Sequence, residues 1–234
     1  MGEFGLRELK LREEYLNKLK NGVPSRRDIS PRDNYDLDSL LNIGIPRLYQ
    51  EVVFEDFEFS NTKSGNIAKE VISNYLDNLH DVFDSCVNLL IYGKNGRGKT
   101  YTASLIIKRA FEFYYTSRLY NYATIINNVY SKIDNAEDYA NYEFLCIDEV
   151  GKETQVQSKS NIFLLEQILR LRDQKGLPTI VCTNLDYEQF KNMYGDSITS
   201  LLSQGAMIQM EGKDRRGEVI VNRDGFRKVM GWED

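Results

Sequence analysis

Short apolar runs alternate along this chain with longer segments whose apolar residues recur every three or four positions. The runs have the length and composition of strands buried on both faces, and they occupy 87–92, 142–147 and 179–183. The periodic segments predict helices, at 67–81, 103–111 and 161–173. A further stretch, 118–126, is rich in Tyr and Ile. Strands alternating with helices predict an α/β domain of three layers, a parallel sheet with helices on both faces.

The N-terminal region has a different pattern. The segment from Glu3 to Lys20 predicts an amphipathic helix whose apolar stripe is Phe4, Leu6, Leu9, Leu16 and Leu19. Residues 21–24, Asn-Gly-Val-Pro, end that helix, and 25–42 are polar and proline-punctuated, which favours a linker or a loosely packed arm. We therefore predict a helical arm and linker at 1–42 and a globular domain at 43–234.

Composition excludes several classes of protein to which this chain could belong. The 234 residues are 41% apolar and 12% aromatic, enough for one domain with a core and too apolar for a wholly disordered chain. A net charge of −5 argues against a surface built entirely for nucleic acid. No run is long enough to span a membrane, and the N-terminus is unlike a signal peptide. The dispersed cysteines, Cys86, Cys146 and Cys182, favour free thiols in a reducing compartment, so we expect a cytoplasmic protein.

The strongest motif lies between a predicted strand and a predicted helix. Residues 93–100 match the phosphate-binding pattern G-x-x-x-x-G-K-[ST]. Its glycines let backbone N–H groups curl around an anion, and the helix N-terminus adds partial positive charge. Lys99 is placed to reach the β- and γ-phosphates, and the Thr100 hydroxyl to bind Mg²⁺. The nucleotide-binding residues that we predict are Gly93, Lys94, Asn95, Gly96, Arg97, Gly98, Lys99, Thr100 and Tyr101.

Two other strands end in polar residues. Asp148 and Glu149 follow an apolar run, which places them at the carboxyl edge of a parallel sheet, where such sheets bind ligands. Asp148 is a candidate Mg²⁺ ligand, and Glu149 is a candidate base for the attacking water. Asn184 follows the run 179–183 and is a candidate for contacting the γ-phosphate or that water. The alternative is that Asn184 only caps the next helix.

In their order and spacing these motifs resemble those of the AAA+ ATPases and, among them, the DnaC/DnaI helicase-loader and IstB-like group. The resemblance spans about 43–216. It includes Gly151 after the acidic pair, and the further segments Gly44–Tyr49, Phe54–Phe57, Gly176–Leu185 and Glu211–Arg216.

The resemblance implies a three-layer AAA+ domain with a minimal or absent helical lid, which binds ATP and Mg²⁺ and hydrolyses ATP. It places Lys99, Glu149, Asn184 and Arg216 at catalytic positions, with Arg215 as an alternate for Arg216, and Thr100 and Asp148 at the metal. It also implies an ATP-controlled loader that grips a replicative hexameric helicase and helps to place it on single-stranded DNA.

In this group a short N-terminal segment contacts the helicase, a role that the predicted arm could fill. Two alternatives fit the same leucines: they pack on the core of their own chain, or they pair in a coiled coil.

The sequence departs from the family pattern at Leu201, where the family has an arginine that reaches the ATP site of a neighbouring subunit. Without that arginine we expect weak hydrolysis, an arginine donated from elsewhere, or a clamp that does not assemble a self-activating ring. Arg170 and Arg172 are the nearest substitutes, unless they form a solvated helix face. Only residues 217–234 follow Arg216, which is too short for a full helical lid.

Direct DNA binding and two rival functions also follow from the sequence. Basic residues gather near the C-terminus, and aromatic rings that could stack on single-stranded bases are Tyr114, Tyr115, Tyr120, Tyr122, Tyr130 and Tyr142. The alternative is that these tyrosines fill the core and its margins. The rival functions are an IstB-like transposition ATPase and a non-hydrolysing ATP-binding adaptor or inhibitor of a replication protein.

Overall fold

Five parallel strands form the centre of the molecule. The computed structural model describes residues 26–28, 30–32, 35–152 and 159–215, so the predicted arm at 3–20 lies outside the described residues. The strands are β1 (Leu89–Tyr92), β2 (Ser117–Asn121), β3 (Phe144–Val150), β4 (Thr179–Thr183) and β5 (Ala206–Gln209). Their order across the sheet is β2-β3-β4-β1-β5, and each neighbouring pair is parallel. The predicted parallel sheet is therefore confirmed.

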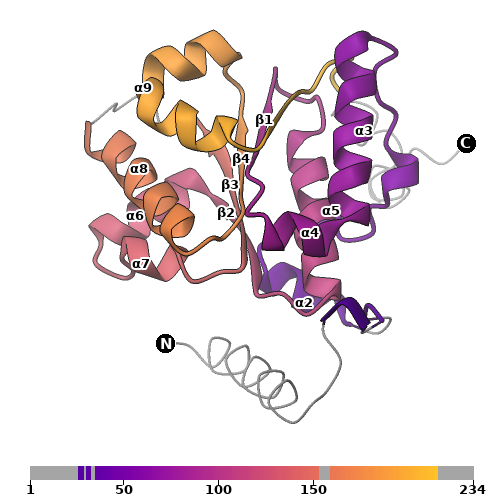
Figure 1. Cartoon of the computed structure of the whole chain (residues 1–234), viewed down its shortest axis with the longest axis horizontal. Helices are drawn as coiled ribbons and strands as arrows, with labels where there is room; N and C mark the ends of the chain where they lie inside the picture. Colours follow the sequence, from indigo (N-terminus) through magenta and orange to yellow (C-terminus); the bar gives the residue numbers. More distant parts are fainter. Residues whose placement is uncertain (1–25, 29, 33–34, 153–158, 216–234) are drawn as a thin grey trace, which may run out of the picture.

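Helices cover both faces of this sheet, which confirms the three layers (Figure 1). On one face lie α3 (Lys63–Asp77), α4 (Leu79–Asp84) and α5 (Lys99–Glu112), with α2 (Leu37–Asn42) beneath them. On the other face lie α6 (Tyr122–Tyr130), α7 (Ala136–Tyr139), α8 (Lys159–Gln174) and α9 (Tyr187–Ser203). Single 3₁₀ turns occupy Arg26–Asp28, Arg47–Tyr49 and Phe54–Asp56. No helix in the described ranges is long and apolar enough to cross a bilayer.

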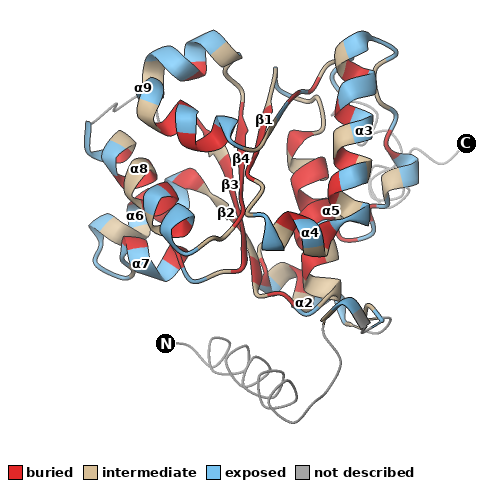
Figure 2. Cartoon of the chain, viewed as in Figure 1, coloured by how far each residue is buried: buried red, intermediate tan, exposed pale blue. Residues whose placement is uncertain are grey.

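The core has two halves, one on each side of the sheet (Figure 2). Leu89 and Ile91 of β1 face the α3–α5 layer, whereas Leu90 between them faces the α6–α9 layer. Alternate side chains of a strand point to opposite faces, so a strand covered on both sides must be apolar at every position. All five residues of β4 are buried accordingly. Cys146 and Cys182 are free buried thiols, as predicted.

Two predicted segments differ from the structure. The helix predicted at 67–81 starts earlier, because Thr62 caps it by accepting the Gly65 N–H, and it breaks at Asn78 into α3 and α4. The stretch 118–126 is divided between β2 and α6. Asn121 ends the strand and caps the helix by accepting the Ala123 N–H, which is a preferred way to begin a helix.

The predicted linker at 25–42 is wrong for its described residues, which pack on the domain. Leu40 in α2 is completely buried, and Arg26 makes a two-bond ion pair with Glu143. The next residues cover the outer edge of β2, since the Leu119 N–H donates to the Ile43 carbonyl. Gly44, at φ +88°, lies so close to the Leu119 carbonyl that a side chain would clash.

One buried arginine joins the amino ends of β3 and β4. Arg172 of α8 is fully buried, and burial lowers the pKa of its guanidinium to about 9. Neutral oxygens surround it: the Thr179 hydroxyl and the carbonyls of Pro178, Tyr142, Tyr139 and Glu143. Carbonyl oxygens thus take the place of a carboxylate partner and hold the α7–β3 and α8–β4 connections together.

Replacing Arg172 with Met should lower the free energy of unfolding by about 3 kcal/mol, because several buried carbonyls lose their donor. Arg170→Met is the matched control. Arg170 is exposed and pairs with Glu166 one turn away, so its loss should cost less than about 1 kcal/mol. Urea unfolding of both variants measures the difference, and equal losses would contradict this role of Arg172.

Candidate nucleotide-binding site

The phosphate-binding loop has the backbone that its motif predicts. It connects β1 to α5, and Gly96 and Gly98 have φ values of +73° and +89°. Neither could carry a side chain, since a Cβ at Gly96 would meet the Asp214 carboxylate and one at Gly98 the Phe57 ring. Gly98 is also the N-cap of α5, so the first N–H groups of that helix open into the loop.

Lys99 lies within the curl of this loop. Its side chain is buried, and Nζ donates to the carbonyl oxygens of Gly93, at 2.7 Å, and Lys94, at 2.9 Å. These bonds hold the ammonium group against the first two residues of the loop. A cation held in a ring of N–H donors is the arrangement that binds a polyphosphate.

Thr100 and Asp148 meet across the sheet edge. The Thr100 hydroxyl donates to Asp148 Oδ2 at 2.7 Å, and Asp148 Oδ1 accepts the Glu149 N–H at 2.7 Å. Burial raises the pKa of Asp148, and the bonds from Thr100 and from the Glu149 N–H act in the opposite direction. A hydroxyl and a carboxylate that already touch are a suitable oxygen pair for a hard cation such as Mg²⁺.

These oxygen donors suit Mg²⁺, which needs few protein ligands, better than a metal whose ligands all come from the protein. Among the residues that the structure describes, no three His, Cys, Asp or Glu side chains gather into a metal site. Mg²⁺ is commonly held by one or two protein oxygens, with phosphate and water completing its shell.

Glu149 has a strained backbone. Its φ is +62°, and the pairing of β3 with β4 shifts register between Ile147 and Val150, so the strand bulges at the acidic pair. Its carboxylate accepts hydrogen bonds from the Asn121 side-chain amide and from Lys152 Nζ. Glu149 is therefore directed toward the end of β2.

Asn121 is a site residue that the sequence analysis missed. It aligns with Asp148 in the pairing of β2 with β3, so its amide lies beside the acidic pair. The available signal was a polar residue at the end of a strand, but that strand was not separated from the helix that follows it.

Asn184 reaches the same edge of the sheet. It follows Thr183, which aligns with Tyr92 of β1 on one side and Val150 of β3 on the other. The capping alternative for Asn184 is wrong, because Asp186 caps α9 in a capping box with Gln189. The half-buried Asn184 thus lies between the phosphate loop and the acidic pair.

Arg216 lies outside the described residues, whereas its alternate, Arg215, lies against the loop. The Arg215 N–H donates to the Gly96 carbonyl at 3.0 Å, and its guanidinium stacks 4.5 Å from the Phe57 ring centroid. Tyr101 packs 5.0 Å from the same ring, and its hydroxyl donates to the Val53 carbonyl. The segment after β5 therefore covers the loop, and no helix follows β5 up to residue 215.

Of the two substitutes for the family's arginine, the structure contradicts Arg172, whereas Arg170 stays a prediction. Arg172 is buried and cannot reach another subunit, and Arg170 bonds to Glu166 and Ser197 on its own surface. Leu201 is 9% exposed and packs in the core beneath α9. An arginine at position 201 would therefore enter a core rather than extend from a surface.

Several of the candidate stacking tyrosines also belong to the core. Tyr115 and Tyr122 are buried, and Tyr139 and Tyr142 pack around Tyr120. Of the six candidates, Tyr130 is the most exposed, at 54%. The alternative that these rings fill the core and its margins is thus confirmed for Tyr115 and Tyr122.

Known proteins share both the sequence pattern and the fold. Residues 24–210 match the family model described as IstB-like ATP binding protein. The Replicative helicase loader DnaC of Escherichia coli K12 is 24% identical over 200 residues, covering 81% of this chain and 75% of that protein. DnaC of Buchnera aphidicola subsp. Baizongia pistaciae is 23% identical over 196 residues, covering 80% and 74%.

Solved structures extend the likeness to three dimensions. A crystal structure of DnaI aligns with a TM-score of 0.61 at 18% identity, covering 74% of this chain and 95% of its own. A crystal structure of the DnaC helicase loader aligns with a TM-score of 0.61 at 17% identity, covering 71% of this chain and all of its own. The fold is therefore that of an AAA+ P-loop ATPase. Because the matched residues include the phosphate loop, the acidic pair and most of the chain, the protein belongs to the IstB-like ATP binding protein family.

Proposed function

We propose that this chain is an ATP-dependent loader of a replicative DNA helicase, which delivers the helicase to single-stranded DNA in the cytoplasm. The observation that supports it best is the joining of Lys99, Thr100 and Asp148 at one sheet edge, in a chain whose relatives are named replicative helicase loaders. The ATP state of this edge would control contact with the helicase.

Each site residue then has a distinct task. Lys99 turns from the loop carbonyls to the β- and γ-phosphates, and Thr100 and Asp148 hold Mg²⁺. When bound there, the cation would supply positive charge against the phosphates. Glu149 orients the attacking water and accepts its proton, and Asn184 contacts the γ-phosphate or that water. Arg216, or Arg215 in its place, contacts the γ-phosphate.

Hydrolysis by the isolated chain should be slow for two reasons. Leu201 replaces the arginine that would otherwise enter a neighbour's site, and such an arginine contributes about 10³–10⁵ in rate where it acts. Glu149 is also bonded to Asn121 and Lys152, so it must change partners before it can engage water. A homo-oligomer of this chain would need an arginine from another position.

A second candidate function keeps the same nucleotide site without turnover. The buried Leu201 and the engaged Glu149 favour an ATP-binding adaptor or inhibitor of a replication protein. The two functions differ in one measurable quantity, the rate of ATP hydrolysis in the presence of the helicase.

Replacing Glu149 with Gln should leave ATP binding intact and reduce turnover at least about 100-fold, because the amide cannot accept the proton. Lys99→Ala is the companion variant and should weaken ATP binding itself. Calorimetry and a phosphate-release assay separate the two effects. Unchanged turnover in Glu149→Gln would exclude Glu149 as the base.

Replacing Asn121 with Ser should raise basal hydrolysis roughly fivefold, since Glu149 loses a restraining hydrogen bond of about 1 kcal/mol. Ser keeps the N-cap of α6, so the fold should not change. ATP affinity, measured in parallel, should stay the same. A fall in turnover would instead mean that Asn121 positions Glu149 for catalysis.

Binding of this chain to a helicase is the direct test of the proposed loader function. The full chain should co-purify with the replicative helicase of its own cell, and changing both Leu16 and Leu19 to Glu should abolish this while sparing ATP affinity. The control changes Glu13 and Glu14 to Gln, which keeps the leucines. Failure of the unaltered chain to bind the helicase, with or without ATP, would refute the loader function.

A further inference from the structure

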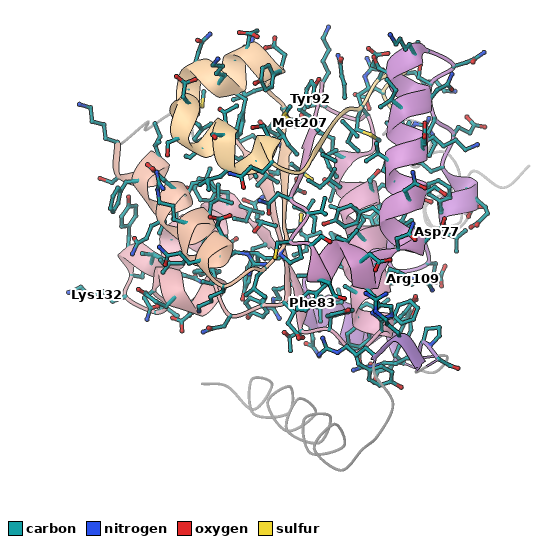
Figure 3. All side chains as sticks on the ribbon, in the orientation of Figure 1. Asp77, Phe83, Tyr92, Arg109, Lys132 and Met207 are labelled. Atoms are coloured by element: carbon teal, nitrogen blue, oxygen red, sulfur yellow. The ribbon has the colours of Figure 1, made fainter. Side chains whose placement is uncertain are left out.

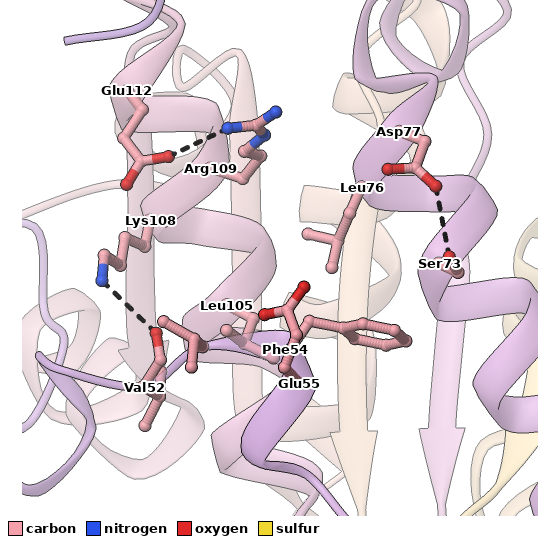
Figure 4. Close-up of a pocket in the computed structure, with 11 residues that line it drawn as sticks. Val52, Phe54, Glu55, Ser73, Leu76, Asp77, Leu105, Lys108, Arg109 and Glu112 are labelled. Atoms are coloured by element: carbon pink, nitrogen blue, oxygen red, sulfur yellow. Dashed lines mark hydrogen bonds and ion pairs between the residues drawn. The ribbon is translucent and has the colours of Figure 1, made fainter. Parts of the chain in front are cut away.

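A cleft separate from the nucleotide site opens between α3 and α5 (Figure 4). It has a volume of about 280 Å³, and none of its lining residues belongs to the phosphate loop or to β3 and β4. The walls come from the segment 52–55, from α3 and from α5. The apolar lining residues are Val52, Val53, Phe54, Leu76 and Leu105, and Val53 is 42% exposed. The cleft can therefore accept one or two aliphatic side chains.

The charges around the cleft are unequally satisfied. Its cations are engaged: Lys108 donates to the Gln50 and Val52 carbonyls, and Arg109 pairs with Glu112 and stacks on Phe113. Among its acids, Asp77 accepts only the Ser73 hydroxyl in the described structure. Glu55 makes no ion pair there, and both Asp77 and Glu55 are exposed. The rim thus favours a basic partner.

The first described residues contact α4 and the end of α5, next to residues that line this cleft. Arg27 bonds to Asp81 and Asp84 of α4, which directly follows the α3 end that carries Asp77. The Arg32 N–H donates to the carbonyl of Glu112, a lining residue. Figure 3 labels Asp77 and Arg109, and both lie on this side of the molecule, whereas Lys132 lies on the far layer.

The segment that precedes Arg26 has the matching chemistry. Between residues 6 and 20 it carries five Lys or Arg and three Glu, together with the leucines at 6, 9, 11, 16 and 19. Residues 21–25 link it to Arg26 and span up to about 17 Å when extended, enough to bring the segment to the cleft.

We propose that the leucine stripe of residues 6–19 docks in the cleft of its own chain, with its basic side chains against Glu55 and Asp77. This docking does not depend on the proposed function. If the same leucines also bind a helicase, the two contacts exclude each other, and the helicase must draw the segment out of the cleft.

Disulfide trapping in the full-length chain tests the proposal. Ser73→Cys places a thiol in the cleft, and Leu16→Cys places one on the stripe. On mild oxidation the double variant should form an intramolecular disulfide at a rate independent of protein concentration, because a tethered partner has an effective concentration in the millimolar range. The control pairs Leu16→Cys with Ser203→Cys, an exposed serine on α9, and should react at least about tenfold more slowly.

Two further comparisons make the result decisive. Each single-cysteine variant measures the background from Cys86, Cys146 and Cys182. Glu55→Lys should slow trapping several-fold, whereas Glu188→Lys on α9 should not. Equal trapping at Ser73 and Ser203 would overturn the proposal. So would a disulfide-linked dimer that grows with concentration, because it would assign the cleft to the segment of a second copy.

Discussion

The hydrogen bond between the Thr100 hydroxyl and the Asp148 carboxylate is the contact on which the site depends. It joins the first turn of α5 to the end of β3, two elements that are not adjacent in the sequence. It is possible only because β4 alone separates β1 from β3 in the sheet. Asn184, at the end of β4, consequently falls between the loop and the acids. The sheet order thus decides which side chains meet at this edge.

Around that bond the predicted catalytic side chains are each held by neighbouring groups. Lys99 is held by loop carbonyls, and Glu149 is held by Asn121 and Lys152. The strained φ of Glu149 means that part of the packing energy is spent on keeping this residue in place. Under the proposed function, Lys99 and Glu149 must both exchange these partners before ATP is hydrolysed.

The two ends of α5 lie at opposite edges of the sheet. Thr100 lies at the carboxyl edge. Glu112, about 18 Å further along the helix axis, accepts hydrogen bonds from the Arg32 N–H and the Tyr35 hydroxyl. Arg26 is fixed nearby at the amino edge, where Glu143 bridges the starts of β2 and β3 through Thr116. One helix thus contacts both the candidate nucleotide site and the described residues that precede α2.

The sequence alone determined the α/β class, the phosphate loop and the acidic pair, because each depends on local order: apolar runs, glycine spacing and residues that directly follow a strand. It also indicated both end residues of strand β4, since a strand buried on both faces leaves an uninterrupted buried run. Only the tertiary structure decided that Asn121 bonds Glu149, that Arg172 is buried and that Leu201 packs in a core. It also decided that the described residues before Ile43 join the domain. These facts depend on which segments meet across the sheet, and long-range pairing leaves no local periodicity in the chain.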